Sequence, residues 1–138
     1  MAQRVEPRVG DGRFLLKIRN AVNRTTLKRR DFILEQIGQC VATFTAQIGA
    51  EGLSWTETKK RLGEEGWQTS VLFTKHIYMS MEARGEKTSA MPWRLITISL
   101  CPAQRATDAS YDQLKWLDDL IAEAQRHCAR LERLKKAS

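Results

Sequence analysis

Basic side chains that could neutralise phosphate groups crowd the first thirty residues of this chain. Residues 1–30 hold nine Lys or Arg against two acidic residues, and that excess of seven equals the formal net charge of +7 of the whole chain. Residues 31–107 carry eight charges of each sign, and residues 108–138 carry six of each. Lysine and arginine bind phosphates and release their condensed counterions, so this block predicts a polyanionic partner, with nucleic acid favoured and DNA preferred. The alternative is a basic end that only keeps the chain solvated.

Ten basic residues are the candidate nucleic-acid contacts. Half of them end the basic block, three follow one another at 59–61, and two lie in a segment expected to be a loop. The group at 59–61 would extend the surface if it shares a face with the first block, and the loop pair would act as a wing. Contacts to phosphate position a protein without reading sequence. The candidates are Arg19, Arg24, Lys28, Arg29, Arg30, Lys59, Lys60, Arg61, Arg84 and Lys87.

Side chains that could carry catalysis or hold a metal are sparse and scattered. His76 and His127 are the only imidazoles, and neither belongs to a set with the spacing of a zinc site. Cys40, Cys101 and Cys128 are far apart, so we expect buried free thiols. Phosphate-loop, dinucleotide and hydrolase signatures are missing from the sequence. We therefore predict a protein that is not an enzyme, with no cofactor and no metal.

Length and composition are those of one globular unit. The chain has 138 residues, with 42% apolar and 28% charged side chains, which fits a single packed domain. We expect a flexible basic lead-in at residues 1–12 and a single domain at residues 13–138. No apolar run is long enough to span a bilayer, and the first residues lack the apolar centre of a secretory signal. These features predict a cytoplasmic protein that does not bind membranes.

Two helices are expected in the first third of the chain. Apolar residues at helical spacing predict a short amphipathic helix over residues 14–22. The pair Thr25-Thr26 then offers a new N-cap, and the pattern over residues 33–48 predicts a long helix. Basic residues 28–30 fall at the positive end of that helix dipole, where a carboxylate such as Asp31, or a bound phosphate, must compensate.

Capping boxes mark the start of two further helices. Ser54 with Glu57 predicts a short helix over residues 55–65, and Ser110 with Gln113 predicts a long helix that runs almost to the chain end. We favour internal packing for the apolar seam of the last helix, and a homodimer or a protein partner is the alternative. The seam consists of Leu114, Leu117, Ile121, Ala124, Cys128 and Leu131.

Alternating apolar residues predict a β-hairpin between these helices. The two strands would cover about residues 70–82 and 93–101. The first segment could instead be helical, because Phe73, Ile77 and Met81 also recur at steps of four. The expected fold class is therefore α+β, with N-terminal helices, a short helix, a hairpin and a long C-terminal helix.

One stretch resembles a known family. A Leu-Ser-Trp cap after glycine, a short helix ending in leucine, a glycine turn and a second serine cap are similar to the helix-turn-helix of small plasmid-borne DNA-binding proteins involved in replication, partition or conjugal transfer. The resemblance covers about residues 37–80 and rests on Gly52, Leu53, Ser54, Trp55, Glu57, Leu62, Gly66 and Ser70. It implies a recognition helix at residues 70–83 in place of the first strand. The polar side chains on that helix able to reach base edges would be Thr74, Lys75, His76 and Ser80.

Two functions are consistent with these features. The first is a nucleic-acid-binding protein that grips phosphates with its basic N-terminal segment and that comes from a plasmid or another mobile element. The second is a small interaction protein, such as an adaptor, a subunit or an inhibitor of a nucleic-acid-handling complex, whose basic face docks on an acidic protein.

Overall fold

Helices make up all the regular structure in the described part of the chain. The computed structural model describes residues 7–65, 67–86, 89–100 and 111–137. None of the helices in those ranges is long and apolar enough to cross a membrane. The helices are α1 (Pro7–Arg24), α2 (Leu27–Gln47), α3 (Trp55–Glu65), α4 (Trp67–Ala83), α5 (Ala90–Leu100) and α7 (Tyr111–Ala137).

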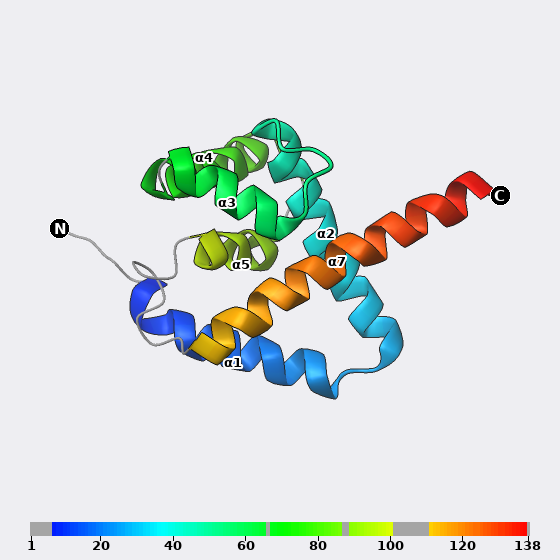
Figure 1. The fold of residues 1–138 in the computed structure, drawn as a ribbon. Coiled ribbons are helices and arrows are strands. Elements are labelled where there is room, and N and C mark those ends of the chain that lie inside the picture. Colours follow the sequence, from blue (N-terminus) through cyan, green and yellow to red (C-terminus); the bar gives the residue numbers. More distant parts are fainter. Residues whose placement is uncertain (1–6, 66, 87–88, 101–110, 138) are drawn as a thin grey trace.

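The two longest helices, α2 and α7, cross at the centre of the molecule (Figure 1). Helix α1 lies along the lower edge in that view and joins α2 through a short turn. Helices α3 and α4 lie at the opposite, upper side, and α5 lies between them and α7. The last turns of α7 extend past the body of the molecule.

The predicted β-hairpin is wrong, because both of its strands are helices. Residues 70–82 belong to α4, in which Thr74 and Ile77 are buried and Tyr78 and Met81 are half-buried. These four positions are separated by steps of three, one and three, which is the inner stripe of a helix. The helical alternative for this segment is therefore confirmed, and the fold is all-α over the described residues instead of α+β.

Helix α5 replaces the second expected strand, at residues 93–101. Leu95 and Ser99 are as buried as the alternating Ile96, Ile98 and Leu100, so the helix is enclosed on nearly all sides. The half-buried residues are Met91, Arg94 and Thr97, at helical steps of three. The alternation of Ile96, Ile98 and Leu100 was misleading, because a segment buried on nearly all sides shows little contrast between its faces. Residue 101 lies outside the described residues.

A proline in the first turn of α5 marks its start. Pro92 sits where a missing N–H costs nothing. The hydroxyl of Ser89 accepts a hydrogen bond from the Met91 N–H at 3.3 Å. The segment expected to be a wing is the turn from α4 into α5, which holds Arg84; Lys87 lies outside the described residues.

The predicted starts of α2 and α3 are confirmed by their caps. Thr26 Oγ1 accepts from the Arg29 N–H at 3.3 Å, and Ser54 Oγ accepts from the Glu57 N–H at 3.2 Å. Gly49 follows α2 with a φ of 76°, a left-handed conformation suited to glycine.

The first and last helices begin at residues that differ in part from those predicted. The last helix is present as predicted and begins at Tyr111, while its expected cap, Ser110, lies outside the described residues. Helix α1 begins at Pro7, earlier than the sequence pattern indicated, so residues 7–12 of the expected lead-in are helical. Residues 1–6 lie outside the described residues.

One apolar core joins all six helices, with α4 contributing Ile77. Gly38 lets α2 and α7 approach closely, because a Cβ on this residue would lie 2.3 Å from Cys128 Sγ and 2.9 Å from the Ala124 carbonyl oxygen. Among the largest fully buried side chains are Leu15, Ile37, Phe44, Trp55, Leu95, Leu100, Leu117 and Ile121.

A chain of polar contacts also fastens α3, α5 and α7 together. The buried Trp55 Nε1–H donates to Ser99 Oγ at 3.0 Å, and the Ser99 hydroxyl donates to Asp118 Oδ1. The other oxygen of Asp118 pairs with the Lys59 ammonium. Trp55, Ser99, Asp118 and Lys59 thus all have hydrogen-bond partners in this network, as burial of polar groups requires.

Candidate nucleic-acid interface

The outer face of α1 carries a row of exposed cations. Arg13, Lys17 and Arg24 are exposed and separated by steps of four and seven, so they lie on one side of the helix. Leu15 and Val22 form the opposite, buried side. At 1.5 Å per residue the row spans roughly 17 Å.

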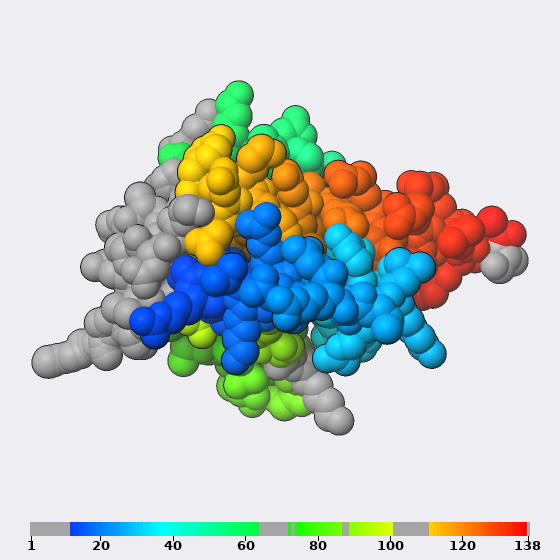
Figure 2. Space-filling view, turned by 90° about the horizontal axis from the view of Figure 1, so that it is seen from below, coloured from blue at the N-terminus to red at the C-terminus, as the bar shows by residue number. Residues whose placement is uncertain are grey.

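The turn into α2 continues this row. Lys28 and Arg29 are exposed in the first turn of α2, which contains no acidic residue. We call the set Arg13, Lys17, Arg24, Lys28 and Arg29 the basic strip. Figure 2 shows α1 across the middle of this face, with the start of α2 beside it. Within the described residues, no member of the strip forms an ion pair with a carboxylate.

Arg13 and Lys17 are interface candidates that the sequence reasoning missed. Both were counted in the basic block, but only the residues nearer α2 were nominated. Their four-residue separation, offset from the apolar stripe of the same helix, was the signal that could have identified them.

Arg30 is also a nominated contact, but its side chain is held against α7. Its two terminal nitrogens donate to the two carboxylate oxygens of Glu123 on α7, both at 2.9 Å. The side chains are 30% and 39% exposed. Glu123 thus supplies the carboxylate that was expected from Asp31 at the start of α2. Such a bidentate pair leaves Arg30 poorly placed to bind an external phosphate.

Arg19 faces a neighbouring helix. Its guanidinium carbon lies 6.0 Å from the ring centroid of Trp116 on α7, and the side chain is half-buried. A second pair of this kind connects α5 to α1, because the guanidinium carbon of Arg94 lies 4.3 Å from the ring centroid of Phe14. These cation–π contacts hold α1 against the body of the protein.

The basic group on α3 does not share a face with the basic strip. Lys59 pairs with Asp118, and Arg61 donates to the Gly49 carbonyl oxygen at 3.4 Å, beside the C-terminal end of α2. The basic strip lies at the other, N-terminal end of α2. Helix α2 has 21 residues and is about 30 Å long, so it separates the two groups. Lys60 is exposed on α3. Arg84, in the turn after α4, pairs with Glu86 at 3.0 Å.

Helices α3 and α4 occupy the segment that resembles a helix-turn-helix. Residue 66 alone separates them. Lys75 and His76 are exposed on α4, and Ser80 is half-buried. Thr74 is fully buried, so its hydroxyl cannot reach a base edge.

Other chemically active groups are dispersed. No group of three or more His, Cys, Asp or Glu that could hold a metal occurs in the described part of the chain. His127 is buried, with Nδ1 3.3 Å from an Arg130 nitrogen. Burial raises the pKa of the Cys128 thiol, and the negative charge of Glu35 raises it further. A thiol with a raised pKa is a poor nucleophile at neutral pH.

Comparison with known proteins adds no assignment. No protein-family model, no curated protein and no solved structure matches the chain.

Proposed function

We propose that this protein binds the phosphate backbone of nucleic acid through the basic strip and that it is not an enzyme. The observation that carries the proposal is the row of five exposed cations, free of carboxylate partners among the described residues, along α1 and the start of α2. A row of this kind tracks a line of phosphates without reading bases.

DNA is the favoured nucleic acid in this proposal, and a plasmid or another mobile element is the proposed origin. Both rest on the α3–α4 segment that resembles the helix-turn-helix of plasmid-borne proteins. Exposed Lys75 and His76 on α4 are the side chains proposed to approach bases. The proposed location of the protein is the cytoplasm.

The test is a salt titration of binding to a short DNA duplex. Five phosphate contacts predict a plot of log affinity against log salt with a slope of about −4.5. The double substitution Lys28→Ala with Arg29→Ala removes two contacts, so it should flatten the slope by about two and weaken binding to every duplex alike. Arg30 is left intact because its pair with Glu123 supports the fold.

The matched control removes the same charge elsewhere. Lys60→Ala with Arg61→Ala also lowers the net charge by two, but on α3, beyond the far end of α2. Binding by the strip predicts a much smaller effect from this pair. Equal losses from both double variants, or affinity that does not change with salt, would refute the proposal.

A protein partner is the second candidate, and one observation favours it. Leu72 and Met79 lie on the same side of α4 and are 68% and 59% exposed, which is apolar surface suited to a protein contact. A protein that purifies free of nucleic acid and comigrates with one defined protein would favour this candidate.

A further inference from the structure

An exposed phenylalanine lies beside two cations of the basic strip. Phe32 is 55% exposed, and it follows Lys28 and Arg29 by four and three residues, so the three side chains share one side of α2. In the described part of the chain, no other aromatic ring packs against Phe32. A single exposed apolar residue is common on protein surfaces, but this one adjoins cations that have no carboxylate partner among the described residues. Its ring forms a flat apolar surface within a positively charged one.

Asn20 adds an amide to the same surface. It is exposed on α1, three residues after Lys17 and four before Arg24, in the middle of the row of cations. Its side chain has no hydrogen-bond partner within the ranges that the structure describes. An amide offers both a donor and an acceptor, and base edges present both as well. The strip thus combines cations for phosphates, an amide for base edges and a ring for base faces.

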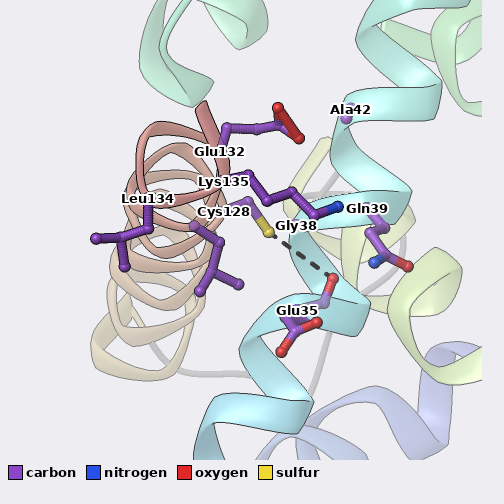
Figure 3. A pocket seen from close by; sticks show the side chains of 9 residues that line it. Glu35, Gly38, Gln39, Ala42, Cys128, Glu132, Leu134 and Lys135 are labelled. Atoms are coloured by element: carbon purple, nitrogen blue, oxygen red, sulfur yellow. Dashed lines mark hydrogen bonds between the residues drawn. The ribbon is translucent and has the colours of Figure 1, made fainter. Parts of the chain in front are cut away.

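The carboxylates closest to Phe32 along α2 do not cancel the charge of the strip. Asp31 is half-buried, and it forms no ion pair within the described residues. Glu35 lines the groove between α2 and α7, where the Cys128 thiol donates to its carbonyl oxygen at 3.9 Å (Figure 3). The negative charge of Glu35 acts there on the Cys128 thiol. Glu35 therefore borders the groove beside α7, and the surface around Phe32 stays positive.

We propose that the basic strip binds single-stranded nucleic acid, with an unpaired base stacked on Phe32 and the adjoining phosphates on Lys28 and Arg29. This assignment rests on the proposed function and specifies the class of nucleic acid. In a duplex the base faces are covered by the neighbouring bases of the stack, so Phe32 has nothing to contact. In a single strand every base can offer a face, and aromatic side chains beside a basic surface bind such faces with little regard to sequence.

Electrostatics alone does not favour a single strand. Each phosphate contact contributes about −0.9 to the salt slope on duplex DNA and about −0.7 on a single strand, because the duplex holds its counterions more densely. A strip that bound only phosphates should therefore bind the duplex at least as tightly at low salt. A preference for the single strand then measures what the ring contributes.

The test is a pair of binding titrations of the full chain at one low salt concentration. One uses a short oligothymidine strand, and the other uses the duplex of that strand with its complement. The expected result is tighter binding to the single strand. Phe32→Leu should weaken single-strand binding by roughly tenfold and leave duplex binding unchanged, whereas Phe32→Tyr keeps a ring and should keep the preference. An oligouridine strand in the same series distinguishes unpaired RNA from unpaired DNA.

Leu27→Ala is the matched control for Phe32→Leu. Leu27 is a 75% exposed apolar residue at the start of the same helix, but it cannot stack on a base, so both affinities should be unchanged. A wild-type chain that prefers the duplex, or a Phe32→Leu variant that binds strand and duplex as wild type does, overturns the assignment. Salt-dependent duplex binding would in that case still support the proposed function. Failure to bind either nucleic acid overturns both.

An anionic membrane is the other partner that exposed apolar residues among cations would suit. Asn20 favours nucleic acid, because an amide carried into the apolar part of a bilayer loses its hydrogen bonds to water. Vesicles that contain phosphatidylserine are therefore titrated with the same variants, and weak binding is expected. Tight vesicle binding that Leu27→Ala and Phe32→Leu reduce equally would identify a lipid surface and overturn the assignment.

Discussion

Glu123 decides what Arg30 can do. Its carboxylate takes both terminal nitrogens of Arg30, while Lys28 and Arg29 beside it remain exposed. The sequence placed all three basic residues in one block and could not separate them, because the carboxylate that captures one of them lies 93 positions away. Spacing along a helix predicts which residues share a face, but it does not predict a partner brought in by tertiary folding.

The substitution Glu123→Gln should therefore have two opposite effects. Loss of the pair between α2 and α7 should lower the free energy of unfolding by about 1 kcal/mol, since both side chains are partly exposed. Arg30 is released at the same time, so affinity for a DNA duplex should rise. Urea denaturation measures the first effect, and a binding titration at fixed salt measures the second. Weaker DNA binding would mean that Glu123 mainly holds the basic strip in place.

Asp118 and Asp119 are adjacent in the sequence but have different roles. Asp118 connects Ser99 to Lys59, whereas Asp119 pairs with Lys115 in solvent, where the side chains are 68% and 62% exposed. The sequence shows two similar carboxylates, and only the positions of α3 and α5 distinguish them.

Asp118→Asn should lower the free energy of unfolding by about 2 kcal/mol, because the largely buried side chain of Lys59 loses its charged partner. Asp119→Asn is the matched control and should cost less than about 0.5 kcal/mol. Equilibrium unfolding in urea, followed by tryptophan fluorescence, compares the two. Similar losses would show that the polar chain contributes little.

The helices that carry their own start signals were the ones the sequence predicted well. Thr26 and Ser54 cap α2 and α3 as expected, because capping depends on residues three positions apart. Helix α5 lacked a readable period, since burial on nearly all sides removes the contrast between faces. Pro92 was assigned to a loop, although its place in a first turn is a common helix signal.

Gly38 lies where α2 and α7 cross, and a larger residue there should push the two helices apart. Replacing glycine by alanine inside a helix usually stabilises it by up to about 1 kcal/mol. Gly38→Ala should instead destabilise the protein by roughly 1–3 kcal/mol, because the added methyl meets Cys128 Sγ and the Ala124 carbonyl. Thermal or urea unfolding of Gly38→Ala and wild type shows whether the substitution stabilises or destabilises the protein.

A second variant separates the two obstacles. Cys128→Ala removes the sulfur, so the double variant with Gly38→Ala should be more stable than the sum of the two single effects predicts. The recovery should stay incomplete, because the Ala124 carbonyl belongs to the backbone and cannot be removed. Additive effects would place the clash elsewhere.

At the scale of the whole molecule, α2 separates two surfaces. The basic strip lies at its N-terminal end, and the packed α3–α4 pair lies beyond its C-terminal end (Figure 1). Charge counting placed the positive excess correctly along the chain. It could not show that residues 59–61 stand apart from the strip in space, since that depends on the length and direction of α2.

This one-sided charge gives the molecule an electric dipole moment, and that has a consequence for encounter rates. A polyanion attracts the basic strip while the protein is still diffusing, so the protein is already oriented with the strip toward the polyanion when the two collide. The association rate constant for a DNA duplex should therefore fall steeply as ionic strength rises, and more steeply for wild type than for Lys28→Ala with Arg29→Ala. Stopped-flow fluorescence across a salt series measures it. The placement of the strip at one end then determines how quickly a phosphate backbone is found as well as how tightly it is held.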